Sequence, residues 1–127
     1  MSGRQVSGRF TGYAALFDRV DRAGDVIRAG AFGEPRTVPL LWQHRGEPVG
    51  RASVHEDRRG LAVDGIIDDP ALAAAVRGGA VAGLSVGYRP RAVRQGANRE
   101  LTAVDLVEVS LVAIPMQSLA RVAQFFT

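Results

Sequence analysis

The sequence predicts a mainly β or α+β fold, in the form of a small, mostly antiparallel β-barrel with one clear helix at about residues 69–78. Three observations support this prediction. Short apolar runs alternate with polar residues between turn residues, as strands do. Only one segment has the composition and the caps of a helix. Strands and helices do not alternate as they do in βαβ folds. We expect the chain of 127 residues to form a single domain, 1–127.

Four segments of the N-terminal half have the alternating pattern of strands: residues 6–17, 38–44, 49–56 and 60–67. Gly12 predicts a bend in the first of them. The last two are expected to form a hairpin around the polar turn at residues 57–60. The short apolar segment at residues 26–33 is expected to pack across one end of the barrel.

The helix is expected within residues 68–79 because its signals agree. Asp68 or Asp69 can cap its N-terminus, and Pro70 suits the first turn. An alanine-rich stretch follows, and two glycines at 78–79 end the helix.

The C-terminal part is expected to begin with a hairpin whose tip lies at residues 91–99. The longest strand-like run follows at residues 101–114 and ends at Pro115. Residues 118–126 are compatible with a short closing helix or a tail.

Two faces can be assigned along residues 101–114 from the alternation of side chains. One face carries Val107, Val109, Leu111 and Ala113, and we expect it to face the core because it is wholly apolar. The other face carries Leu106, Glu108, Ser110 and Val112. A carboxylate in such an apolar run requires an exposed edge strand, or else an arginine or histidine partner.

Composition excludes several kinds of chemistry. The chain has no cysteine, so disulfides, thiolate metal sites and a cysteine nucleophile are excluded. All 16 basic residues are arginine, which excludes a catalytic lysine. No apolar run reaches the length of about 20 residues that a membrane helix needs. The N-terminal residues lead straight into a strand-like pattern and do not predict a signal peptide.

Two charged segments raise the question of a ligand. Residues 18–25 carry three aspartates without the spacing of a calcium loop, so turn and capping roles are expected, and no metal or cofactor. A basic patch is present on the second half of the chain: Arg89, Arg91, Arg94 and Arg99. A solvated hairpin is expected there rather than a nucleic-acid site, because the single tryptophan and two tyrosines offer no stacking platform.

A candidate nucleophile lies between glycines, because residues 83–87 read Gly-Leu-Ser-Val-Gly. Little side-chain bulk surrounds Ser85, and nearby backbone N–H groups can turn toward an oxyanion. Both histidines precede Ser85, which excludes the chain order of the α/β-hydrolases. His44 at the end of a strand is the better candidate for a base. His55 lies among charged residues, is expected to be exposed, and is the weaker candidate for base or third group.

The chain resembles the prohead maturation proteases of tailed phages, of the HK97 type, and their relatives in gene transfer agents. The shared stretches run in the same order over nearly the whole sequence: GYAALF at 12–17, Asp21, GDVI at 24–27, GAF at 30–32, PLLWQH at 39–44, PVG at 48–50, GL at 60–61, Gly79, GLSVGY at 83–88, EVSLV at 108–112 and Pro115. The resemblance implies the fold of the herpesvirus assemblins, a β-barrel with helices, and the activity of a serine endopeptidase.

The resemblance also implies roles for particular residues. Ser85 would be the nucleophile and His44 the general base. The third member of the assemblin pattern lies a little over twenty positions after the serine, and Glu108 lies 23 positions after Ser85. Asp105 and Ser110 are the alternatives. Candidate oxyanion donors are backbone N–H groups beside Ser85 or an arginine of residues 89–94.

The implied substrate is the major capsid protein with its scaffolding segment, cleaved inside the immature head in the cytoplasm of the bacterial host. Homo-oligomers are compatible with this role. Many relatives have a longer C-terminal tail, whereas this chain ends at Thr127, so self-cleavage is not part of the expectation. Two other functions are open: a catalytically silent capsid-assembly or scaffolding module of the same fold, and a small DNA-binding barrel that uses the arginine hairpin.

Overall fold

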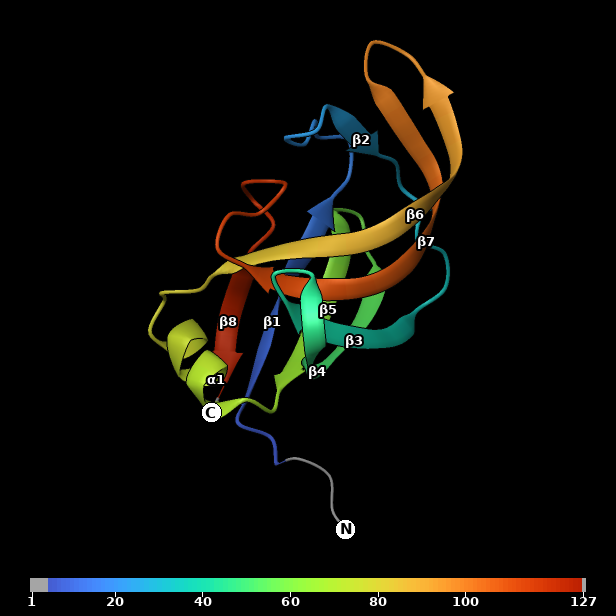
Figure 1. The fold of residues 1–127 in the computed structure, drawn as a ribbon. Helices are drawn as coiled ribbons and strands as arrows, with labels where there is room; N and C mark the ends of the chain where they lie inside the picture. Colours follow the sequence, from blue (N-terminus) through green and yellow to red (C-terminus); the bar gives the residue numbers. More distant parts are fainter. Residues whose placement is uncertain (1–4, 127) are drawn as a thin grey trace.

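The computed structural model describes residues 5–126 (Figure 1). The elements follow one another in the order β1 (Gly8–Leu16), β2 (Asp25–Ile27), β3 (Arg36–Trp42), β4 (Arg45–Glu56), β5 (Gly60–Ile67), α1 (Pro70–Arg77), β6 (Gly83–Gln95), β7 (Arg99–Val112) and β8 (Val122–Phe126). The predicted mainly β fold with one helix is therefore confirmed for the described part of the chain. No helix among the described residues is both long enough and apolar enough to cross a membrane.

The strands form one mixed sheet, in the order β2-β7-β3-β4-β5-β1-β8, with β6 paired to β7. Most pairs are antiparallel, but β2 and β3 both run parallel to β7. The long strand β7 pairs with β6 along one edge. Its other edge pairs with β2 near its start and with β3 near its end. The sheet is not closed, so the prediction of a complete barrel was wrong in that respect.

The local elements with strong sequence signals form as predicted. Strands β4 and β5 make the expected hairpin, in which Asp57 accepts hydrogen bonds from the N–H groups of Arg59 and Gly60. Helix α1 begins after Asp69, whose side chain accepts from the N–H of Leu72, and Pro70 opens the helix. These are short-range interactions, which is why the local sequence could predict them.

The C-terminal segment is a strand rather than the short helix considered above. Strand β8 pairs antiparallel with β1. The pairing requires close contact of two backbones, because a Cβ at Gly12 would lie 2.2 Å from the carbonyl oxygen of Arg121. Val122 and Phe125 pack against the core. Tertiary pairing thus overrides the helix propensity of the alanine- and leucine-containing segment.

Strand β7 changes which face it turns to the core. Opposite β6, the register passes from Gly87↔Glu108 to Tyr88↔Leu106, so Val107 is an extra residue, a β-bulge. Leu106 belongs to the core before the bulge, and Val109 after it. Val107, predicted to be buried, is 46% exposed. The uniform two-face assignment was wrong because a bulge inverts the alternation.

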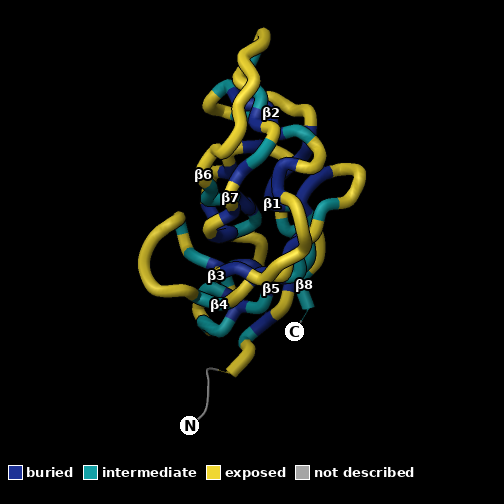
Figure 2. Tube along the Cα trace, turned by 90° about the vertical axis from the view of Figure 1, so that its right-hand side faces the viewer, coloured by how far each residue is buried: buried dark blue, intermediate teal, exposed yellow. Residues whose placement is uncertain are grey.

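The far part of the β6–β7 hairpin extends away from the rest of the sheet (Figure 1). Its residues are mostly exposed, whereas buried positions concentrate in the central strands (Figure 2). Most of the largest fully buried side chains lie on these central strands and at the base of the hairpin: Phe10, Leu40, Leu61, Ile67, Leu84 and Leu111. Leu101, also fully buried, lies farther along β7, where β2 pairs with it. The base of the hairpin, where Ser85 and Glu108 lie, is therefore held by the core.

Candidate active site

His44 lies in a tight turn rather than at the end of a strand. Trp42 pairs with Arg45, so Gln43 and His44 form the two-residue loop between β3 and β4. Both have positive φ, 55° and 63°. Such a loop favours Asn-Gly, and left-handed backbone costs other residues about 1–2 kcal/mol each. The predicted strand at residues 38–44 was wrong at its end, because the strand stops at Trp42.

The strained turn is held by the end of β7. The N–H of Gln43 donates to the carbonyl of Leu111 at 3.0 Å. The side-chain oxygen of Gln43 accepts from the N–H of Ala113 at 2.8 Å. The N–H of His44 donates to Ser110 Oγ at 3.0 Å. The turn is thereby fixed by three hydrogen bonds, as expected where strained backbone persists.

The imidazole of His44 contacts a buried carboxylate. His44 Nδ1 lies 2.5 Å from Glu108 Oε1, and the Glu108 side chain is 8% exposed. The other carboxylate oxygen, Oε2, accepts from the hydroxyl of Ser110 at 2.8 Å. Glu108 is therefore not on an exposed edge. Of the two explanations for a carboxylate in this apolar run, the histidine partner is the one that the structure contains.

Ser110 links the backbone and the side chain of this arrangement. Its hydroxyl donates to Glu108 and accepts from the N–H of His44, and the residue is fully buried. Both the turn that carries the imidazole and the carboxylate beside it are thus tied to one hydroxyl. The sequence offered Ser110 as an alternative to Glu108 for the third group. In the structure Glu108 contacts the imidazole, and Ser110 forms hydrogen bonds with the Glu108 carboxylate and with the backbone of His44.

Gly87 provides the space for the carboxylate. It pairs with Glu108 across the β6–β7 ladder, and a Cβ at this position would lie 2.3 Å from Glu108 Oε1. The second glycine of Gly-x-Ser-x-Gly therefore makes room for the acid. The sequence reasoning had attributed the flanking glycines to access to Ser85.

Ser85 lies on β6 opposite Ser110 and lines an open groove of about 390 Å³ together with His44. The residue is only 5% exposed. No described side-chain nitrogen or oxygen is both fully buried and without a partner. Since no other described residue forms a hydrogen bond with its hydroxyl, the hydroxyl has contact with the groove.

The backbone beside Ser85 presents a donor on the edge of β6 that faces away from β7. The N–H of Leu84 points away from β7 and donates to the carbonyl of Ala120 at 2.9 Å. N–H directions alternate along a strand, so the N–H of Val86 points to that side as well. It lies one residue beyond Ser85, on an edge of β6 that β7 does not cover.

The remaining candidates lie elsewhere. Asp105 pairs with Arg91 on the exposed hairpin, and His55 is exposed on β4 and lines other pockets. The groove contains Arg22, from the aspartate-rich loop, which the sequence reasoning missed. The N–H of Arg22 donates to the carbonyl of Met116, a contact between segments far apart in the chain that no local pattern indicates.

The charged segments have structural partners. Asp21 Oδ1 accepts from the N–H groups of Ala23 and Asp25, which confirms its turn role. Asp25 pairs with Arg99, and these hydrogen bonds hold the pKa of the Asp25 carboxyl below its usual value, against the effect of burial. Residues 5–126 contain no group of three or more potential metal-ligating side chains.

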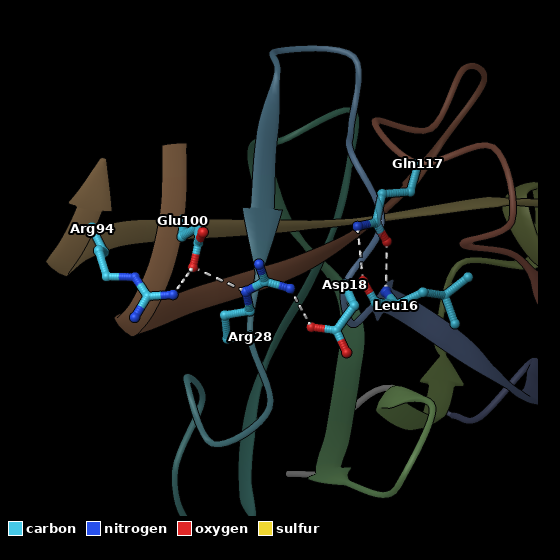
Figure 3. Close-up of polar contacts among 6 residues, drawn as sticks. All are labelled: Leu16, Asp18, Arg28, Arg94, Glu100 and Gln117. Atoms are coloured by element: carbon cyan, nitrogen blue, oxygen red, sulfur yellow. Dashed lines mark hydrogen bonds and ion pairs between the residues drawn. The ribbon is translucent and has the colours of Figure 1, made fainter. Parts of the chain in front are cut away.

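The arginines of the hairpin are largely paired with acids. Arg94 contacts Glu100, which also pairs with Arg28, a residue outside the hairpin that pairs with Asp18 as well (Figure 3). Arg91 pairs with Asp105. A surface whose cations are already neutralised has little attraction for phosphates, which argues against a DNA site here.

The chain matches one protein family and a phage protein of known name. The family described as Caudovirus prohead serine protease matches residues 2–126. The prohead protease of Enterobacteria phage HK97 is 36% identical in an alignment of 100 residues that covers 68% of this chain and 44% of that protein. The match thus spans less than half the length of that relative.

Solved structures show the same fold. A crystal structure of KSHV protease in complex with a hexapeptide phosphonate inhibitor has a TM-score of 0.62 at 14% identity, covering 94% of this chain and 65% of that one. A second KSHV protease structure has a TM-score of 0.55 at 14% identity, covering 94% and 61%. The fold of a herpesvirus protease, the motif order and the match over residues 2–126 lead to one conclusion: the chain belongs to the Caudovirus prohead serine protease family.

Proposed function

We propose that this chain is a serine endopeptidase in which Ser85 is the nucleophile, His44 the general base and Glu108 the acid that orients the base. The observation that carries the proposal is the 2.5 Å contact between His44 Nδ1 and the buried Glu108 carboxylate, beside a groove that Ser85 also lines. A carboxylate at Nδ1 selects the tautomer whose Nε2 can accept a proton.

The reaction divides into two steps. His44 Nε2 takes the proton of Ser85 Oγ as this oxygen attacks the peptide carbonyl, and a tetrahedral intermediate forms. The imidazolium then gives the proton to the leaving amine, and the C–N bond breaks. Water attacks the resulting ester with His44 again acting as base, which releases the new carboxyl end and restores Ser85.

Two groups can stabilise the oxyanion of the intermediate. The N–H of Val86 follows the nucleophile and points away from β7, and Arg22 lines the groove that Ser85 also lines. The N–H of Val86 is one of the backbone donors beside Ser85 that the sequence offered. Arg22 replaces the arginine candidate, because Arg91 and Arg94 are paired with acids on the distant hairpin. Donors aimed at the position of the developing charge lower the barrier most.

The substrate that we propose is the major capsid protein with its scaffolding segment, cleaved inside the immature head in the host cytoplasm. The family and the name of the HK97 relative support this choice. The open groove, bordered by the exposed apolar side chains of Ile114 and Met116, suits an extended and flexible peptide segment.

The test is co-expression of the chain with a major capsid protein that carries its scaffolding segment, followed by mass measurement of the capsid protein. The wild-type chain is expected to remove the scaffolding segment, whereas Ser85→Ala and His44→Ala are expected to leave it intact. His55→Ala is the matched control, because His55 is exposed and does not line the groove. Complete processing by Ser85→Ala would contradict the proposal.

A second measurement separates the protease from a silent assembly module of the same fold. A peptide phosphonate is expected to label wild-type Ser85 covalently and to leave Ser85→Ala unlabelled. Association with the capsid protein, without processing and without labelling, would support the assembly module instead.

A further inference from the structure

Gln43 holds the turn before the general base and still has a donor to spare. Its N–H donates to the carbonyl of Leu111, and its side-chain oxygen Oε1 accepts from the N–H of Ala113 at 2.8 Å. Its side-chain nitrogen Nε2 forms no hydrogen bond with any other residue in the described part of the chain. The structural contacts of Gln43 therefore use one end of its carboxamide and leave the other end available.

The available nitrogen lies at the wall of the groove that contains His44. Gln43 lines this groove, and so do Val112 and Ile114, the two neighbours of Ala113 in the chain. Because Oε1 is held at Ala113, the rest of the same carboxamide lies beside this wall. Gln43 is half-buried, and no described side-chain nitrogen is both fully buried and without a partner, so Nε2 has contact with solvent.

The orientation of the carboxamide is fixed by its partner. The N–H of Ala113 is a donor, so it requires the oxygen of the amide and not the nitrogen. The backbone of Gln43 is fixed as well, by the tight turn and by the hydrogen bond to Leu111. The two N–H bonds of Nε2 are therefore preorganised, and a ligand that accepts from them needs to order little of this side chain.

A peptide in the groove offers the acceptor that such a donor needs. Every residue of an extended peptide carries a main-chain carbonyl, and a neutral amide N–H pairs with it without regard to the side chains of the peptide. Gln43 is the residue directly before His44, and consecutive Cα atoms are about 3.8 Å apart. The carbonyl that reaches Nε2 therefore belongs to a residue close to the bond on which His44 acts.

We propose that Gln43 binds the main chain of the substrate: Nε2 donates to the carbonyl of a residue next to the cleaved bond, while Oε1 keeps the turn attached to Ala113. The hydrogen bond holds the peptide against the wall that carries the general base. This inference rests on the proposed protease function and goes beyond it by naming a substrate-binding residue and the group of the substrate that it recognises.

The test is Gln43→Glu, which keeps the length of the side chain and an oxygen for Ala113 but has no N–H. We expect KM to rise about 10-fold or more, because the substrate carbonyl then faces an oxygen, while kcat changes less and the melting temperature stays that of wild type. Gln43→Met, which lacks both the oxygen and the nitrogen, should also lower the melting temperature. A purely structural role predicts instead that Gln43→Glu is fully active and that only Gln43→Met is impaired. A KM of Gln43→Glu within about three-fold of wild type would therefore overturn the proposal.

The matched control is Gln124→Glu, the same chemical change at an exposed residue of β8 that does not line the groove. It is expected to leave KM unchanged. Because a new carboxylate beside His44 changes the pH dependence of the reaction, the kinetic constants of each variant are compared at the plateau of its own pH profile.

A thioamide scan of the peptide identifies the acceptor. Each main-chain carbonyl except the cleaved one is replaced in turn by C=S, a poorer acceptor. One position is expected to raise KM of the wild type by about 2- to 10-fold and to have no effect in Gln43→Glu. The absence of such a position, or equal effects in both proteins, would refute the contact. A fall in kcat alone for Gln43→Glu, with KM unchanged, would place Nε2 at the oxyanion and also overturn the main-chain assignment.

Binding to Ser85→Ala separates this inference from the proposed function. Fluorescence anisotropy with overlapping peptides from the scaffolding segment of the capsid protein needs no catalysis. Weaker binding by Ser85→Ala with Gln43→Glu than by Ser85→Ala alone supports the role of Gln43 even if the wild-type chain cleaves nothing, which would overturn only the protease. Cleavage by the wild type and by Gln43→Glu with the same KM leaves the protease intact and overturns the role of Gln43.

Discussion

A methyl group added at Gly87 should disable the site without touching any reacting atom. The Cβ of Gly87→Ala would lie 2.3 Å from Glu108 Oε1 and 2.7 Å from Glu108 Cδ, whereas ordinary contacts begin at 3.4 Å. The carboxylate must therefore retreat by about 1 Å. It cannot do so and also keep its 2.5 Å contact with His44, because Ser110 holds its other oxygen.

The size of the effect follows from what the carboxylate is proposed to do. A displacement of about 1 Å in a catalytic arrangement can lower the rate about 10²-fold. Complete loss of the orienting acid lowers kcat by about 10⁴ in a serine protease triad. We therefore expect Gly87→Ala to lose about 10²- to 10⁴-fold in kcat/KM, equivalent to about 3 to 5 kcal/mol of transition-state stabilisation.

The assay is the rate of peptide cleavage, together with the rate of labelling by a peptide phosphonate. Gly78→Ala is the matched control, because its φ is −80° and the added Cβ would lie 3.4 Å from its nearest neighbour. Circular dichroism should show that both variants fold. If folded Gly87→Ala kept kcat/KM within about three-fold of wild type, the proposed coupling of Glu108 to His44 would be refuted.

Two further predictions concern the groups around the site. Ser110→Ala removes a donor to Glu108 and leaves the N–H of His44 without its partner, so we expect a loss of about 1–3 kcal/mol in the free energy of unfolding and at least a 10-fold fall in kcat/KM. Chemical denaturation and peptide cleavage measure the two effects, and unchanged activity would contradict the positioning role. Asp25→Asn should lower the melting temperature at pH 7. Because Arg99 holds the pKa of Asp25 below its usual value of 3.8, the stabilisation is complete above that pH and is lost as the pH falls through the folded-state pKa. The difference in melting temperature between wild type and Asp25→Asn should therefore shrink on acidification below pH 3.8, and a constant difference would refute this account.

Much of the candidate site could be predicted from the sequence, but its geometry could not. The motif order assigned Ser85, His44 and Glu108, and the structure brings the last two into contact. The alternation pattern placed His44 on a strand and Val107 on the core face. Both placements failed for local reasons, namely the positive-φ turn at Gln43 and His44 and the bulge at Val107.

The sequence by itself determined the elements that depend on neighbours in the chain. The cap at Asp69, the turn at Asp57 and the mainly β character all rest on interactions over a few residues. Only the tertiary structure decided which strands pair. The parallel contacts of β7 with β2 and β3, the pairing of β8 with β1 and the position of Ser110 behind both Glu108 and His44 join segments that are distant in sequence. A two-residue period reports which faces of a strand are apolar, but it carries no information about the partner strand or about an extra residue in the ladder.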